Sequence, residues 1–473
     1  MATLTRSAAL PAWMSAFKTP EEVNRPVTDV EGRLPDGLAG TLYRVGPAKL
    51  DLAHHLFDGD GMVSAVRFAP DGGVHCATRF VRTGKYLAEL NANRPAVKGF
   101  GTLVGRGGAL RNAVQLSPGK GNAANTSLMF TAGRLLALWE VGHPWQVDPS
   151  TLETIGEMDF DGALEARLPF SAHPHWDPAT GEIFNFGMVY GRKNSVASYR
   201  IDRSGRLHRL AEFGVPAAVM NHDFIITDRW LVFCLNPLRM RLMRFLSGRA
   251  AFGDSLEYHA DEATTIVLVP RAGGDPVYVE APAWFQFHFA AAFDDGDDVV
   301  IDLSRYQSYD DIGPYLKAFR TSASYGRPPT LWRYRVSTKT RRAEGHELSP
   351  QGLEFPQVDG RRATGGYRVI YGEFMDSERG VSGRIGRIEL DTGRTDAWDP
   401  GSGWLVSEPI FVPRPGGNDE DDGWLIAHAY DPDRQATDAV VLDARDLSAG
   451  PLFTAHLPVN TGVTFHGAWR RAA

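Results

Sequence analysis

The stretch SAVRFAPDGGVHCATRFV, residues 64–81, introduces a pattern that recurs along the rest of the chain. Two runs rich in β-branched and aromatic residues flank the turn sequence Pro70-Asp71-Gly72-Gly73. Proline sets φ for the start of a tight turn, and glycine accepts the positive φ that such turns require. The segment therefore predicts a β-hairpin.

Similar hairpin units follow along most of the chain, with no run of amphipathic helices between them. They are WQVDPSTLETIGEM (145–158), HWDPATGEIFNFGM (175–188), ASYRIDRSGRLHRLAEF (197–213), RYRVSTKTRRAEG (333–345) and RIELDTGRTDAW (387–398). This pattern argues against βαβ winding and predicts an all-β fold. A closed propeller would leave few exposed strand edges, but no WD or kelch repeat is visible, so a double β-sandwich fits the pattern as well.

Composition restricts the partners that the chain can have. The 473 residues are 43% hydrophobic, carry a formal net charge of -7, and spread their lysines and arginines along the sequence. No basic field favours nucleic acid, so we expect no nucleic-acid partner. The two cysteines, Cys76 and Cys234, are far apart, which indicates neither a disulfide framework nor a thiolate metal site.

The sequence also gives expectations about location. The first 17 residues contain one arginine and a short apolar patch broken by Pro11, which does not match a secretory leader. No run of about 18 apolar residues occurs, so no transmembrane helix is expected. We therefore predict a cytoplasmic protein.

Residues 237–252 differ from the hairpin pattern. Leu238, Leu242, Phe245 and Leu246 recur at helical spacing, and arginines fall off that stripe. One interpretation is a cap helix packed on the sheets. The other is a basic amphipathic helix that makes peripheral contact with a membrane in which an apolar substrate is dissolved.

Four histidines share a context at the edge of a strand-like run, beside small, aromatic or turn residues. They are His173 in FSAHPHWD, His222 in MNHDFIIT, His288 in WFQFHFAAAF and His466 in VTFHGAW. A single histidine of this kind is more often a satisfied core residue. In a propeller, however, inner strands from distant parts of the chain meet at one axis, and neutral imidazoles suit iron, zinc or copper.

Three glutamates stand in otherwise apolar runs: Glu140 in LLALWE, Glu354 in GLEFP and Glu408 in LVSEPIF. A buried carboxylate needs a hydrogen-bonding or charged partner. Imidazoles that bind a metal usually donate their second ring N–H to such a group. These glutamates are therefore candidates to orient the histidines, with surface or ion-paired glutamates as the alternative.

Six motifs now stand in order along the chain. Two open it, GTLYRVGP (40–47) and HHLFDGDGM (54–62), and the four histidine motifs follow. Together they resemble the carotenoid cleavage oxygenase family from about residue 25 to the C-terminus. The resemblance implies a seven-bladed β-propeller with a dome of loops and short helices over the metal face. Residues 1–473 would form one domain, with residues 1–24 as an N-terminal extension.

The resemblance also implies the site. Fe(II) would lie on the propeller axis, held by His173, His222, His288 and His466. Glu140, Glu354 and Glu408 would support three of these ligands, leaving His173 without a glutamate. Thr126, in the segment AANT, matches a threonine whose methyl group crowds an open coordination position. The sequence departs from the family at His175, where lysine is frequent; His173 and His175 are two residues apart, and we take His173 as the ligand.

Such a centre implies a dioxygenase that splits a carbon–carbon double bond with O2, giving aldehyde or ketone products. Members that cleave hydroxylated stilbenes carry lysine immediately before the first supporting glutamate, whereas this chain has Trp139. An apocarotenoid or carotenoid is therefore the expected substrate, and a stilbene or phenylpropenoid is the alternative. Aromatic residues beside the proposed ligands are expected to line an apolar tunnel; they are Phe285, Phe287, Phe289 and Phe465, and ordinary core packing is the other interpretation.

Two hypotheses from other classes remain at this stage. A non-catalytic binding propeller would bury its histidines singly and hold no stoichiometric iron. A propeller glycosidase would need two carboxylates in a central cleft. The most obvious acidic run, residues 418–422, has the composition of a solvated loop.

Overall fold

The computed structural model of the protein describes residues 12–104, 120–215, 217–317, 326–376 and 381–472. The first eleven residues of the expected N-terminal extension lie outside the described residues. Antiparallel sheets dominate the described part of the chain, and most of their strands follow one another in sequence order. Apart from one two-stranded sheet, seven sheet units result within the described residues, because the longest sheet divides into two at β23.

The first three units are meanders of four strands each. One comprises β6 (Ser127–Thr131), β7 (Arg134–Leu138), β8 (Trp145–Val147) and β9 (Thr154–Glu157). The second comprises β10 (His175–Trp176), β11 (Ile183–Val189), β12 (Asn194–Ile201) and β13 (Leu207–Val215). The third comprises β14 (Ile225–Ile226), β15 (Trp230–Leu235), β18 (Thr264–Pro270) and β19 (Val277–Ala281).

The next two units share the long strand β23 (Arg342–Gln357), whose first part pairs with β22 and whose last residues pair with β24. The strands of the first are β20 (Phe289–Asp295), β21 (Asp298–Arg305), β22 (Thr330–Ser337) and β23. The second continues with β24 (Val369–Asp376), β25 (Val381–Glu389) and β26 (Thr395–Trp398).

The last two units combine both ends of the chain. One contains β27 (Leu405–Val406), β28 (Ile410–Pro413), β29 (Gly423–Asp431), β30 (Ala436–Asp443), β31 (Pro451–His456) and β2 (Val30–Gly32). The other contains β32 (Gly467–Arg471), β3 (Gly40–Ala48), β4 (Asp60–Phe68), β5 (Val74–Phe80) and β1 (Val23–Val27). Because β32 pairs with β3, the C-terminal strand closes the ring onto the N-terminal strands.

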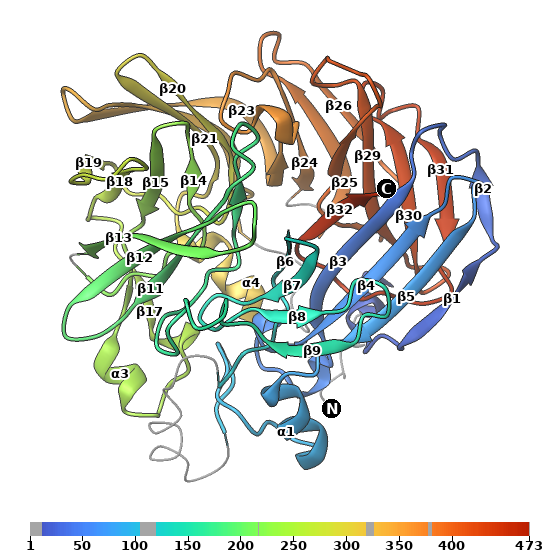
Figure 1. Ribbon diagram of the computed structural model, residues 1–473, viewed down its shortest axis with the longest axis horizontal. Coiled ribbons are helices and arrows are strands. Elements are labelled where there is room, and N and C mark those ends of the chain that lie inside the picture. The colour runs from blue at the N-terminus through green and yellow to red at the C-terminus, as the bar shows by residue number, and fades with distance from the viewer. Residues whose placement is uncertain (1–11, 105–119, 216, 318–325, 377–380, 473) are drawn as a thin grey trace, which may run out of the picture.

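Figure 1 shows the units arranged around a common centre, as the blades of a β-propeller. The strands β6, β14 and β32 lie nearest that centre in their units, and β9, β19 and β1 lie farther out. We call the strand of each blade that lies nearest this common centre its inner strand. The predicted hairpins are present: the turn at residues 69–73 joins β4 to β5, and Gly72 there has a φ of 87°.

Site residues cluster just before the inner strands. Thr126 precedes β6, His288 precedes β20 and His466 precedes β32. His173 and His222 precede β10 and β14 by two and three residues. Since successive blades bring the same end of their inner strands to one face, side chains far apart in sequence meet there.

Loops, a two-stranded sheet and short helices lie among the blades. The small sheet pairs β16 (Leu238–Met240) with β17 (Leu256–Tyr258). The helical segments are η1 (Ala12–Phe17), η2 (Leu50–Leu52), η3 (Leu56–Asp58), α1 (Gly84–Ala92), α3 (Leu242–Leu246), η4 (Gly253–Ser255), η5 (Tyr309–Asp311), α4 (Gly313–Lys317) and η6 (Gly360–Arg362). No helix within the described ranges is long and apolar enough to cross a bilayer.

The prediction of one helix over residues 237–252 is wrong. Leu238 is buried in β16, and the helix α3 is confined to five residues, Leu242–Leu246. Pairing between β16 and β17 satisfies backbone groups that a continuous helix would have used internally, so this long-range contact overrides the local helical periodicity.

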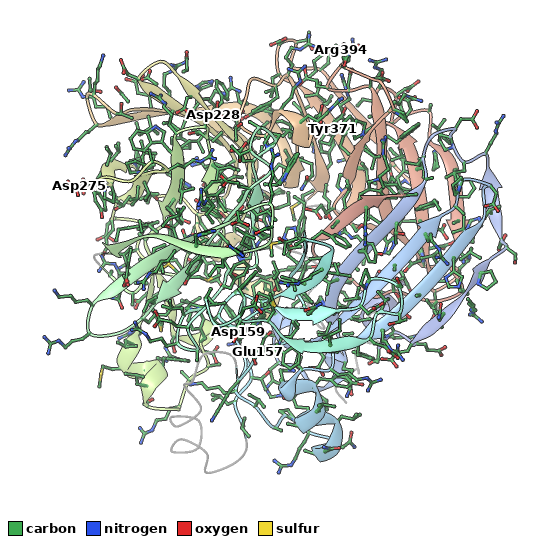
Figure 2. All side chains as sticks on the ribbon, in the orientation of Figure 1. Glu157, Asp159, Asp228, Asp275, Tyr371 and Arg394 are labelled. Atoms are coloured by element: carbon green, nitrogen blue, oxygen red, sulfur yellow. The ribbon has the colours of Figure 1, made fainter. Side chains whose placement is uncertain are left out.

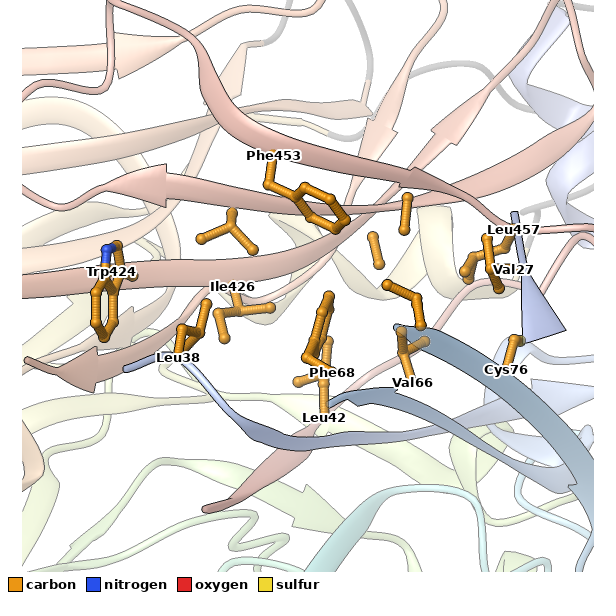
Figure 3. Close-up of a cluster of buried hydrophobic side chains, with 14 of the residues drawn as sticks. Val27, Leu38, Leu42, Val66, Phe68, Cys76, Trp424, Ile426, Phe453 and Leu457 are labelled. Atoms are coloured by element: carbon orange, nitrogen blue, oxygen red, sulfur yellow. The ribbon is translucent and has the colours of Figure 1, made fainter. Parts of the chain in front are cut away.

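Apolar side chains fill the spaces between blades. Figure 3 shows the cluster between the sheet that contains β4 and the sheet that contains β31. In this cluster Phe68 of β4 faces Phe453 of β31. Their ring centroids are 6.3 Å apart, and Trp469 of β32 lies 6.0 Å from Phe68. Charged side chains such as Asp275 and Arg394 lie at the rim, whereas Tyr371 is fully buried (Figure 2).

Replacing Phe68 by alanine should lower the free energy of unfolding by about 3–5 kcal/mol, because a fully buried ring is lost and a cavity remains. Thermal unfolding followed by circular dichroism measures the effect. As a control, Ile155→Ala on β9 removes a side chain that is 59% exposed and should shift stability by less than about 0.5 kcal/mol. Equal midpoints for the two variants would contradict the packing described.

Candidate metal centre

Four imidazoles from four blades meet at the centre of the ring. One ring nitrogen from each of His173, His222, His288 and His466 lies within 4.8 Å of the others. The ring centroids of His173 and His222 are 4.2 Å apart, and those of His288 and His466 are 5.0 Å apart. These are the four histidines that the sequence singled out.

The arrangement fits a single metal ion. Metal–imidazole bonds are about 2.1 Å long, so nitrogens on opposite sides of one ion lie about 4.2 Å apart. The Nε2 atoms of His173 and His222 are only 2.8 Å apart, a distance at which two lone pairs repel unless a proton or a cation lies between them. The buried Nε2 of His288 has no hydrogen-bond partner among the described residues. A cation bound by these nitrogens would satisfy both conditions.

Three buried or half-buried glutamates lie beside the Nδ1 edges of three of these rings. Glu354 Oε2 lies 2.6 Å from His288 Nδ1, and Glu408 Oε1 lies 2.9 Å from His466 Nδ1. Glu140 Oε1 lies 3.0 Å from His222 Nδ1, although the two atoms are not aligned as a hydrogen bond. Nδ1 of each ring therefore faces a carboxylate, which leaves Nε2 for the common centre.

His173 differs from the other three histidines. Its Nδ1 is 3.9 Å from Asp223 and its Nε2 is 3.8 Å from Glu140, so neither carboxylate is within hydrogen-bonding distance. Burial lowers the pKa of His173 well below its usual value, and the neighbouring imidazoles lower it further. His173 is therefore neutral and keeps a lone pair for a metal.

Carboxylates oppose the effect of burial on the pKa of two other imidazoles, His288 and His466. Burial lowers the pKa of His288, but Glu354 at 2.6 Å, together with Asp223 and Glu408, raises it, and the net shift of the pKa is upward. Burial also lowers the pKa of His466, and here the opposing effect of Glu408 is smaller. Burial raises the pKa of Glu408, yet His466 and Arg44 together lower it below its usual range. Glu408 is thus held ionised beside the imidazoles.

His175 lies outside the cluster. Its Nε2 is 3.0 Å from Asp223 Oδ1, and its ring packs edge-on against Phe224 with centroids 5.0 Å apart. Asp223 also accepts hydrogen bonds from the backbone N–H groups of Phe224 and Phe289. Asp223 thereby ties together the starts of β14 and β20, close to His222 and His288.

Sequence reasoning missed Asp223 and two further residues around the histidines. Arg44 is fully buried; its Nη1 donates to the backbone O and Oε2 of Glu408, and its Nη2 donates to Phe465 O. Phe355 stacks on His288 with ring centroids 4.7 Å apart. A charged residue inside the apolar strand β3 was the available signal for Arg44.

A cavity of about 800 Å3 opens onto the histidines. His222, His288 and His466 contribute to its wall, together with Thr126 and residues of the covering loops. Those loop residues are largely apolar; they include Leu56, Phe57, Phe100, Leu242, Phe245, Leu246, Phe252, Ile312 and Leu316. The volume falls in the range of sites that enclose a small organic ligand, about 300–1,000 Å3.

The predicted aromatic residues divide into two groups. Trp139, Phe287 and Phe465 line the cavity. Phe285 and Phe289 are not part of its wall: Phe285 packs against Tyr306 and Tyr309, and Phe289 is buried in a core cluster between blades. For those two, the expectation of a tunnel position is wrong and the alternative of ordinary core packing holds, since both rings are buried against other apolar side chains.

The chain is similar to known proteins over most of its length. The sequence profile of the family described as "Retinal pigment epithelial membrane protein" matches residues 16–471. The apocarotenoid-15,15'-oxygenase of Synechocystis sp. is 34% identical over 482 residues, covering 98% of this chain and 97% of that protein. The chain belongs to the carotenoid cleavage oxygenase family. Another member, lignostilbene-alpha,beta-dioxygenase isozyme III of Sphingomonas paucimobilis, is 32% identical and covers 94% of both chains.

Solved structures of this family share the fold. The crystal structure of cobalt-substituted Synechocystis ACO has a TM-score of 0.91 and 33% sequence identity, and covers 98% of both chains. The predicted seven-bladed β-propeller is therefore confirmed. Family membership also confirms the prediction of an iron-dependent oxygenase with Fe(II) as cofactor, and it sets aside the binding propeller and the glycosidase.

Separate replacement of His173 and His175 by alanine distinguishes their roles. His173→Ala should lower bound iron to less than one tenth of the stoichiometric amount, because it removes one of the four converging nitrogens. His175→Ala should retain iron, since its ring faces Asp223 instead. Metal analysis of the two purified variants measures this. Iron lost from the His175 variant and kept in the His173 variant would reverse the assignment.

Proposed function

We propose that this protein is a non-haem Fe(II) dioxygenase that cleaves a carbon–carbon double bond of an apocarotenoid or carotenoid with O2 and releases aldehyde or ketone products. The observation that carries the proposal is the meeting of four buried or half-buried imidazoles, three of which line an apolar cavity of about 800 Å3. The match to the family profile over residues 16–471 supports treating the whole chain, residues 1–473, as one working domain.

In this proposal His173, His222, His288 and His466 hold the iron. Bound iron supplies redox chemistry with O2 that side chains cannot provide. Glu354 and Glu408 accept hydrogen bonds from the Nδ1–H groups of His288 and His466, which fixes the tautomers and keeps Nε2 directed at the centre. The carboxylate of Glu140 lies 3.0 Å from Nδ1 of His222 and favours the same tautomer there. Arg44 holds Glu408 in place through hydrogen bonds to its backbone O and its Oε2.

Thr126 lies on the cavity side of the site. Its hydroxyl group donates to Asn125 Oδ1, at 3.0 Å, and its backbone O accepts from the N–H of His466. With the hydroxyl engaged, the methyl group is the part of the side chain available to the cavity. We assign it the role of limiting which atoms can approach the metal.

Trp139, Phe287 and Phe465 hold the alkene in the cavity. Phe287 packs edge-on against His222, with ring centroids 4.9 Å apart, so an apolar chain beside it lies next to the metal ligands. These rings exclude water and restrict the orientation of the double bond. No acid or base from the protein is required.

Trp139 favours a long polyene over a phenolic alkene. An indole donates one hydrogen bond but carries no positive charge, so it does not stabilise a phenolate. The relatives include both apocarotenoid and lignostilbene oxygenases, which makes the stilbene or phenylpropenoid class the alternative to test.

Anaerobic loading with Fe(II), followed by O2 and a panel of apocarotenoids and stilbenes, tests the function. We expect a pair of carbonyl products from an apocarotenoid, with a kcat/KM at least ten-fold above that for any stilbene, read by mass spectrometry. The matched control is His173→Ala, which should give no product. A preference for hydroxylated stilbenes would transfer the assignment to the alternative class, and no cleavage of either class by the iron-loaded protein would refute the proposal.

We further propose a cytoplasmic protein that touches the membrane through α3. Met243 is 79% and Leu246 is 37% exposed, and three arginines, Arg241, Arg244 and Arg249, lie close to them in the sequence. Leu242, Phe245 and Leu246 also line the cavity, so a substrate dissolved in lipid would enter next to this helix.

The double variant Met243→Ser/Leu246→Ser should reduce co-sedimentation with anionic liposomes by at least three-fold, because it removes the exposed apolar contacts. Binding that stays unchanged would leave α3 as a packing helix. Replacement of the exposed Ile155 by serine, on the blade β6–β9, serves as the control and should have no effect.

A further inference from the structure

Two arginines, Arg167 and Arg192, form part of the wall of the apolar cavity. Both are exposed, so they lie where the cavity meets solvent. Arg167 pairs with Glu165, with Nε and Oε2 2.9 Å apart, yet its side chain stays 72% exposed. No carboxylate among the described residues forms an ion pair with Arg192. We call these two arginines the cationic rim, and its second guanidinium group is open to an anion.

Two neighbouring stretches of chain bring the arginines of the cationic rim together. The backbone N–H of Ser171 donates to Phe186 O at 2.7 Å, and a Cβ atom placed on Gly187 would be 2.1 Å from Pro169 O. These two contacts run antiparallel along the end of β11. The chain that precedes Pro169 therefore lies beside the turn at residues 190–193, and each stretch carries one of the arginines.

Tyr190 connects the cationic rim to the metal centre. It lines the cavity two residues before Arg192, and its hydroxyl group donates to Val219 O at 2.8 Å. Burial raises the pKa of this hydroxyl group, and the nearby charge of Glu140 raises it further. Because Glu140 contacts His222, an extended molecule with one end at the rim can pass over Tyr190 and reach the histidines.

The rest of the cavity wall is a poor place for a carboxylate. Glu140 and Glu354 line the part near the histidines, and their charges repel an anion there. The side chains of Leu242, Phe245 and Leu246 in α3 offer it no hydrogen bond. Apart from a bound metal ion, the cationic rim is therefore the part of the wall that favours a carboxylate, since a guanidinium group can bind both carboxylate oxygens.

We propose that the cationic rim binds the terminal carboxylate of a polyene whose apolar chain fills the cavity, which makes a polyene acid the preferred class of substrate. The inference rests on the proposed function and deepens it, because it assigns an end group to the alkene that is cleaved. With the carboxylate held at the rim, the chain is oriented toward the histidines. Cleavage then gives one product that carries both the carboxylate and a new carbonyl group, and one neutral carbonyl product.

Binding of retinoic acid and retinol, which share one polyene skeleton, tests the rim without turnover. Iron-loaded protein kept free of O2 is titrated with each ligand at a pH where the acid is ionised. Quenching of tryptophan fluorescence reports binding, since Trp139 lines the cavity. We expect the Kd of the acid to be at least three-fold lower than that of the alcohol. High ionic strength should bring the ratio of the two Kd values toward one, because salt screens an exposed charge pair.

Variants of the exposed Arg192 separate the rim from other binding modes. Arg192→Gln should abolish the preference for the acid, and Arg192→Glu should reverse it by repulsion, whereas both should bind retinol as the unmodified protein does. The matched control is Arg206→Gln, at an exposed position in the turn at the opposite end of the same blade, which should keep the preference.

Two results would overturn the proposal. One is equal affinity of the unmodified protein for acid and alcohol. The other is a preference for the acid that persists in both Arg192 variants, which would place the carboxylate elsewhere, for instance on the iron. Because the titrations contain no O2, failure of alkene cleavage in a separate aerobic assay would count against the proposed function and would leave the binding result as it stands.

Discussion

The rest of the site depends on the convergence of four imidazole rings, one nitrogen of each lying within 4.8 Å of the others. Their mutual crowding leaves lone pairs directed at one point, and a cation there removes the repulsion. Glutamates on the outer side of three rings compensate the charge of that cation through the imidazoles. Glu354 and Glu408 lie within 3 Å of their histidines. The burial of Glu354 and Glu408 is tolerated because each of the two carboxylates has a hydrogen-bonding partner.

The propeller places the rings accurately because each one stands at the start of an inner strand. His288 adjoins β20 and His466 adjoins β32, and those strands are fixed by pairing within their blades and by packing between blades. The pairing of β32 with β3 has a double role. It closes the ring, and it sets His466 beside Arg44, which holds Glu408.

Local chemistry made much of the fold predictable. Turns such as residues 69–73 and 202–205 are specified by Pro, Asp and Gly, and both connect strands as expected. The histidines and their glutamates were predictable from motifs that resemble a known family. Residues 237–252 were not, because the pairing of Leu238–Met240 with Leu256–Tyr258 is a long-range contact that helical periodicity does not encode. Arg44 was missed for a similar reason: the burial of a charged side chain is decided by tertiary packing.

X-ray absorption at the iron edge tests the central claim most directly. In iron-loaded protein without substrate, the account predicts the multiple-scattering signature of four imidazole rings, with nitrogens at about 2.1 Å from the metal. A first coordination sphere containing sulfur or protein carboxylate, or fewer than four imidazoles, would contradict it.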